Sequence, residues 1–148
     1  MPDDSTGGQT VPTTPSTVVW NLDTRKSGIN DDNYFSLASD IITINKSGVF
    51  EISGNFMSTL SSGTRNHIDV RPQVNTGGGF VGVVEGSPTR AYHRLAGIHN
   101  SATIPAFIYP FSAGDQVRVV AYCGSSGGAI TASTSTGGTS FLQIKQVL

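Results

Sequence analysis

The sequence predicts an all-β domain built as an antiparallel two-sheet sandwich. Three segments, residues 41–56, 111–122 and 140–148, alternate apolar and polar side chains with the two-residue period of a strand. Clusters of Gly, Ser and Thr recur between the apolar runs, as expected where short strands are joined by tight turns. No segment carries the periodicity of an amphipathic helix of convincing length, so an all-β fold is the simplest expectation.

The predicted elements number about nine or ten short strands, each bounded by a turn signal. The clearest turns are Lys46-Ser47-Gly48, Thr76–Gly79 and Ser112–Asp115, all containing glycine. The alternation predicts strands, in chain order, over residues 18–22, 42–45, 50–56, 67–74, 80–85, 94–100, 103–109, 116–122, 129–132 and 141–147.

Two of these segments depart from simple alternation. Pro72 has no backbone N–H to donate, so the strand over 67–74 is expected to lie at a sheet edge or to contain a bulge there. The segment 103–109 is apolar on both faces, which predicts burial on both. One sheet face would then have to be covered by another subunit.

The composition fits a single domain that rests against other protein. The 148 residues carry nine Lys and Arg against ten Asp and Glu, and only 13% are charged. No basic field indicates nucleic acid as a partner. No run of about 18 apolar residues would span a membrane, and residues 1–10 lack the features of a signal peptide. We therefore expect synthesis in a cytosol.

Residues with reactive side chains do not form a catalytic pattern in the sequence. Cys123 ends an apolar strand and is interpreted as a buried filler rather than a nucleophile. His67, His93 and His99 lack the spacing of metal ligands with Cys123. Residues 31–33 (Asp-Asp-Asn) could hold calcium, but a turn with an Asx cap is the favoured interpretation. We expect no enzyme activity, no cofactor and no metal.

The first sixteen residues differ in composition from the rest of the chain. They contain three Pro, two acidic residues and many Thr and Ser, with a single Val. Such a segment cannot bury enough surface to fold alone. We expect an extended arm over residues 1–16 and a folded domain over 17–148, with the arm either disordered or ordered on a neighbouring subunit.

Three segments in order, ITINKSGVFEISGNF, FSAGDQVRVVAY and TSFLQIKQVL, resemble complement-globular-head and tumour-necrosis-factor-like jelly rolls. The family's turn-and-strand motif is matched at Lys46–Ile52, its Gly-Asp turn at Phe111–Val117 and its closing strand at Ser140–Ile144. The resemblance covers about 130 residues. It implies a ten-stranded, two-sheet jelly roll that forms a homotrimer about its inner sheet. Residues implied near the threefold axis are Phe107, Tyr109, Phe141 and Ile144.

Without a collagen stalk or a signal peptide, the domain resembles virion proteins of tailed phages, which are capsid decoration (cement) proteins or fibre heads. As a decoration protein it would form a trimer on the outside of the virion, with the major capsid protein as partner. The arm residues expected to contact the capsid are Thr10, Val11, Pro12 and Pro15.

The alternative is a fibre head that recognises a glycan or protein on the host surface. Its site would lie in the loops 58–66, 86–92 and 124–138. Tyr92, His93 and Arg94 offer the stacking and hydrogen-bonding groups that carbohydrates require. A metal-dependent enzyme on a cupin-like fold ranks last, because paired His and carboxylate ligands at close spacing are missing from the sequence.

Overall fold

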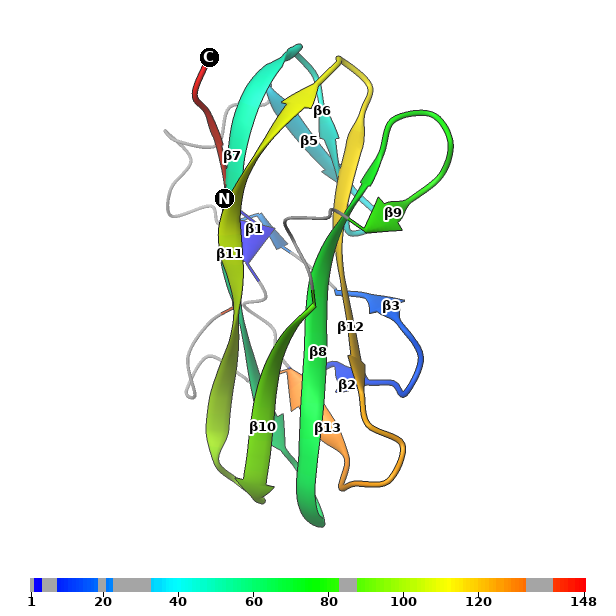
Figure 1. Cartoon of the computed structure of the whole chain (residues 1–148), viewed down its shortest axis with the longest axis vertical. Helices are drawn as coiled ribbons and strands as arrows, with labels where there is room; N and C mark the ends of the chain where they lie inside the picture. Colours follow the sequence, from blue (N-terminus) through cyan, green and yellow to red (C-terminus); the bar gives the residue numbers. More distant parts are fainter. Residues whose placement is uncertain (1, 4–7, 19–20, 23–32, 83–87, 133–139) are drawn as a thin grey trace.

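The computed structural model describes residues 2–3, 8–18, 21–22, 33–82, 88–132 and 140–148. In this part of the chain every regular element is a strand, and the strands form two antiparallel sheets packed face to face (Figure 1). None of the described segments forms a helix with the length and apolar character needed to cross a membrane. The expected all-β, two-sheet sandwich is confirmed.

Sheet A is organised around the long strand β7 (Gly48–Leu60), which pairs with neighbours along both of its edges. One edge pairs with β11 (His99–Phe111), and the other pairs with β13 (Ile130–Ala132) and β14 (Phe141–Gln146). The short strands β2 (Thr10–Val11), β1 (Pro2–Asp3) and β4 (Asn21–Leu22) complete the sheet.

Sheet B is organised around β8 (Thr64–Asn75) and β12 (Gln116–Cys123), which pair along most of their length. The far edge of β8 pairs with β10 (Thr89–Leu95) and β9 (Val81–Gly82). The far edge of β12 pairs with β6 (Ile41–Ile44), followed by β5 (Phe35–Ala38), and with β3 (Ser16–Thr17).

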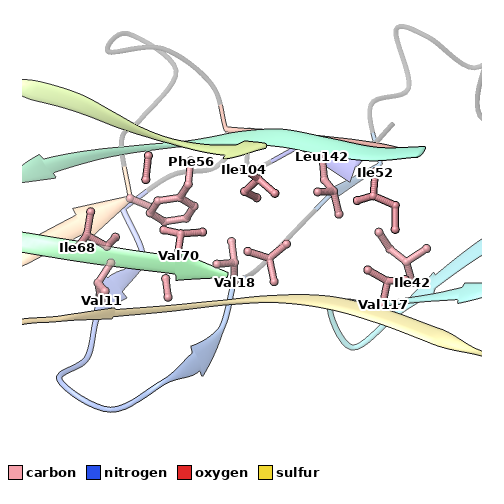
Figure 2. Packing of buried hydrophobic residues seen from close by; sticks show 14 of the residues in the cluster. Val11, Val18, Ile42, Ile52, Phe56, Ile68, Val70, Ile104, Val117 and Leu142 are labelled. Carbon is pink, nitrogen blue, oxygen red and sulfur yellow. The ribbon is translucent and has the colours of Figure 1, made fainter. Parts of the chain in front are cut away.

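The core fills the space between the sheets with one face of each long strand (Figure 2). Alternate residues of β7, from Phe50 to Leu60, are buried, and their neighbours are half-buried on the other face. Ile68 and Val70 of β8 oppose them from sheet B. Each fully buried side chain of this size stabilises the fold by about 1.5–3 kcal/mol relative to exposure.

Gly54 lies on the core face of β7, where β14 approaches most closely. It pairs with Leu142, and a Cβ placed there would lie 2.6 Å from the backbone oxygen of Phe141. The carbonyl cannot move away without disturbing the β7–β14 ladder. Glycine is therefore required here by the close approach of a neighbouring backbone.

A β-bulge in β11 explains the segment that is apolar on both faces. The register with β7 shifts between Ile104 and Phe107, at Pro105-Ala106, where Pro105 lacks the N–H of a regular ladder. Before the bulge the even-numbered residues of β11 face the core, and after it the odd-numbered residues do. In the single chain the outer face of this segment is open, with Ile108 61% exposed, so burial on both faces through another subunit stays a prediction.

The connection between β10 and β11 also differs from the sequence prediction. The strand expected over 94–100 is instead the end of β10, a turn at Ala96-Gly97 and the start of β11. Gly97 has φ 78°, and its N–H donates to the carbonyl of Leu60. The strand expected over 80–85 is confined to Val81–Gly82 among the described residues.

The described part of residues 1–16 lies against the sandwich of its own chain. Thr10–Val11 pairs with β13, Ser16 pairs with β12, and the side chain of Val11 is 5% exposed. The carbonyl of Pro12 accepts a hydrogen bond from the backbone of Cys123. These residues therefore add short edge strands to both sheets.

Candidate functional site

The outer face of sheet A, on the side away from sheet B, carries few charges. We define this face by the outward residues of β7, β11 and β14. Glu51 and Lys145 occupy paired positions on β7 and β14, and they are its only charged residues among those that the structure describes. The others are Val49, Ser53, Asn55, Met57, Thr59, His99, Ser101, Thr103, Ile108, Pro110, Phe141 and Gln143.

The four residues implied near a threefold axis are divided between the two faces of sheet A. Phe107 is 3% exposed and belongs to the core. Tyr109 and Ile144 pack against the core from partly buried positions. Phe141 pairs with Asn55 and is half-buried on the outer face. Of the four, only Phe141 is placed to contact another subunit through the sheet A outer face.

Ile108 is the apolar residue of this face that the sequence interpretation missed. It pairs with Glu51 at the edge of the sheet, beyond the bulge. A regular strand containing Phe107 and Tyr109 on one face would have put Ile108 with Ile104 on the other. Because of the bulge, Ile104 faces the core and Ile108 faces outward. Pro105 is the sequence signal that could have indicated the bulge.

A small hollow lies at the edge of the sandwich between β10 and β11, the strands joined at the lower end of Figure 1. Its cavity volume is about 230 Å³, below the usual range for a drug-sized ligand. Asn100 fixes one wall by donating from Nδ2 to the carbonyl of Tyr92 at 2.9 Å. The lining residues are Tyr92, His93, Arg94, Leu95, Ile98 and Asn100.

His93 is the buried polar residue of this hollow. It is 2% exposed, and its Nε2 lies 2.9 Å from Oγ of Ser58 on β7. Nδ1 makes no hydrogen bond of normal geometry within the described part of the chain. Burial lowers the pKa of His93, and the nearby backbone of Ile98 opposes this effect. His93 is therefore a neutral bridge between the sheets at neutral pH.

The three residues proposed from the sequence as a ligand site lie together in this hollow. Tyr92 and Arg94 are exposed, whereas His93 points into the sandwich and not toward solvent. Ile98 and Asn100, which the sequence analysis did not single out, complete the hollow. Of the predicted loops, residues 86–87 and 133–138 lie outside the described residues, 58–60 belong to β7 and 89–92 belong to β10.

The residues proposed to contact a capsid from the arm have different exposures. Val11 is buried, and its carbonyl accepts a hydrogen bond from Sγ of Cys123 at 3.2 Å. Thr10 and Pro15 are exposed, and Pro12 is half-buried. Thr10 and Pro15 therefore offer the accessible side chains of this set.

Metal and nucleophile chemistry has little support in the described residues. They contain no group of three or more His, Cys, Asp or Glu that could hold a metal ion. Asp31 and Asp32, considered above for calcium, lie outside the described residues. Burial raises the pKa of the Cys123 thiol, which keeps it protonated at neutral pH and unreactive.

Comparison with solved structures identifies the fold. The structure of Eiger TNF from S. frugiperda matches with a TM-score of 0.60 and 11% identity, covering 100% of this chain and 94% of that chain. The globular domain of zebrafish complement 1qA matches with a TM-score of 0.53 and 10% identity, covering 96% and 90%. No protein-family model and no curated protein matches the sequence. The predicted jelly roll of this type is confirmed, and at these identities the likeness shows the fold alone.

Proposed function

We propose that this jelly roll is a non-enzymatic structural protein of a virion, which forms a homotrimer and binds the outside of a virus head. The proposal rests on the sheet A outer face. There Ile108 is exposed, Phe141 is half-buried, and few residues are charged. Depletion of charge with apolar and aromatic anchors is typical of the centre of a protein–protein interface.

The chemistry of this face fits self-association through side chains. Glu51 and Lys145 have opposite charges at paired positions, so the face presents little net charge to an identical copy. An interface of standard size requires about 800 Å² from each partner, a patch that several strands of one sheet can supply. A closed trimer would bury this patch in each subunit without leaving an open end.

The free edge of β11 favours side-chain packing over strand addition. Among the described strands, β11 pairs only with β7, so its other edge is open. The bulge, together with Pro105 and Pro110, makes the backbone of this strand irregular. An added strand from another chain would find few regular partners there, which supports contact through the sheet face.

The proposed trimer and the low fraction of charged residues support a role on a virus head. A trimer matches the local threefold positions of an icosahedral shell, where the major capsid protein would be its partner. A protein that binds only the assembled shell stabilises it by mass action. Synthesis in the cytoplasm and location on the virion surface belong to this proposal.

Cosedimentation with empty heads of tailed phages tests the proposal. We expect binding to assembled heads and not to unassembled major capsid protein, together with a higher temperature of head disruption. The variant Thr10→Asp, at an exposed position in the proposed contact region, should weaken binding while the trimer persists. Equal binding to heads and free subunits, or none to heads, would contradict the decoration role.

A second candidate function, recognition of a host-surface glycan by a fibre head, is favoured by the β10–β11 hollow. Tyr92 is 47% exposed beside Arg94 at its rim, and aromatic rings stack on sugars. Tyr92→Ala should abolish adhesion of the protein to host cells under this alternative. Adhesion that is unchanged by Tyr92→Ala would exclude the hollow as the receptor site.

A further inference from the structure

The outer face of sheet B has the opposite character to that of sheet A, because arginines gather on it. Four of the nine cationic residues of the chain project from the outward positions of β10, β8 and β12. We call this surface the arginine face. Asp69 is its only carboxylate among the described outward residues of these three strands. The arginines are Arg71, Arg90, Arg94 and Arg118.

Asp69 holds Arg90 in a fixed orientation. The Asp69 side chain is buried, and Arg90 donates to its two oxygens from Nε at 2.7 Å and Nη2 at 2.9 Å. This two-point contact raises the pKa of Arg90 through the hydrogen bond and the charge of Asp69. The guanidinium is anchored on one edge and largely exposed to solvent on the others.

Arg118 is held on the other side of β8 without a carboxylate. Its Nε donates to Oε1 of Gln73 at 2.8 Å, and its guanidinium lies 4.1 Å from the ring centroid of Phe80. Burial lowers the pKa of Arg118, yet an arginine remains charged at any physiological pH. The orientation of this cation is therefore fixed while its charge is not neutralised by an ion pair in the described structure.

Arg71 lies between these two groups and has an unsatisfied donor. It is two residues from Asp69 and from Gln73 along β8, roughly 7 Å in each direction. Its Nε is buried and makes no hydrogen bond within the described part of the protein. Its cross-strand neighbour Val120 offers no acceptor side chain. A buried charged donor without an acceptor is costly unless a ligand supplies one.

We propose that the arginine face binds an acidic polysaccharide, with a carboxylate or sulfate group seated on Arg71 between Arg90 and Arg118. Among the residues that the structure describes, three guanidinium groups at this spacing face one carboxylate, an excess of positive charge on a protein whose net charge is −1. An added anion would offset the charge of Arg71 and relieve repulsion among the three cations.

The chemistry of the face favours a polysaccharide over nucleic acid or an acidic protein. The chain has a net charge of −1 and lacks the basic field typical of nucleic-acid-binding domains. Arginine, the only strongly basic residue type among the described residues of this face, pairs with planar carboxylates through two hydrogen bonds. The half-buried amide side chains of Asn75 and Gln116, beside Arg118 on this face, offer hydrogen-bonding groups that suit sugar hydroxyls. This site is separate from the sheet A outer face and does not require a trimer.

Titration calorimetry with three polysaccharides tests this site on the full chain. Heparin supplies sulfate, polygalacturonate supplies carboxylate, and neutral dextran is the control. We expect binding to at least one acidic polymer and none to dextran. Arg71→Gln should weaken binding about tenfold or more, because a charge-assisted hydrogen bond is lost. Arg71→Lys should weaken it several-fold, because an ammonium group cannot donate as a fork.

Lys46→Gln is the matched control, since it removes one positive charge at the exposed turn beside Tyr34. It should change affinity by no more than about twofold, because exposed charges far from the site are screened. Thermal melting verifies that each variant is folded. The proposal is overturned if neither acidic polymer binds, if Lys46→Gln weakens binding as much as Arg71→Gln, or if duplex DNA binds more tightly.

Discussion

His93 Nε2 and Ser58 Oγ lie 2.9 Å apart inside the sandwich and join β10 of sheet B to β7 of sheet A. Both residues are buried, so the contact is a polar bridge within an otherwise apolar interior. The bridge holds the edge of sheet B where the β10–β11 hollow opens. Stability and pH are therefore linked at this place in the fold.

Stability should fall as the pH drops below the ordinary pKa of histidine. Burial lowers the pKa of His93 in the folded state, so between that lowered pKa and about 6.5 the unfolded chain binds more protons. The stabilisation is complete above about pH 6.5 and decreases as the pH falls through this window. Urea unfolding at a series of pH values measures the slope. His93→Gln should reduce the slope relative to that of the unmodified protein, and an unchanged slope would contradict this link.

Gly54→Ala should destabilise the protein by about 1–3 kcal/mol, because the new methyl group would overlap the Phe141 carbonyl. Gly78→Ala is the control, since its Cβ would meet no atom within 4 Å and its φ is not in the left-handed region. Chemical denaturation of both variants gives the difference. Equal stability of the two variants would show that β14 does not approach β7 as closely as described.

The N-terminal strands should protect the thiol of Cys123. Val11 covers this side of the core, and its carbonyl accepts the hydrogen bond from Sγ. Val11→Asp would bury a charge and is expected to release the strand. The rate of Cys123 modification by a thiol reagent should then rise at least about tenfold, following the local opening free energy. Thr13→Asp, at an exposed position, serves as the control and should leave the rate unchanged.

Neighbouring substitutions in β11 should separate folding from assembly. Phe107→Asp places a charge in the core and should prevent folding, which would be seen as the loss of a cooperative unfolding transition. Ile108→Asp places the same charge on the outer face and should preserve the fold while raising the trimer dissociation constant at least about tenfold. Phe141→Asp should behave like Ile108→Asp. Gel filtration with light scattering checks both results, and a folded Ile108→Asp trimer of unchanged affinity would place the interface elsewhere.

The sequence predicted the fold class and most long strands, because alternation reports directly on which side chains face the core. Phe50 to Phe56 are buried in the alternating pattern expected, and Val117, Val119 and Ala121 are buried as expected, although Val120 between them is buried too. The bulge at Pro105-Ala106 could not be read from alternation, since a shift of phase resembles a strand that is apolar on both faces.

Contacts between segments that are far apart in the sequence could not be predicted from local sequence patterns. The pairing of Thr10–Val11 with β13 joins segments over a hundred residues apart, and a Pro- and Thr-rich segment gives no sign of it. The grouping of Arg71, Arg90 and Arg118 depends on the register of three strands, of which 67–74 and 116–122 were predicted and β10 was not. By contrast, the proximity of Tyr92 to Arg94 could be predicted from the sequence, because the two residues are two positions apart on one strand.

Sedimentation equilibrium of the unmodified protein, over a range of micromolar concentrations, tests the proposed assembly most directly. If the sheet A outer face joins three copies, the measured mass should be three times the 15.5 kDa of one chain. A mass of one chain at every concentration would contradict the trimer, and with it the proposed match to threefold positions on a virus head.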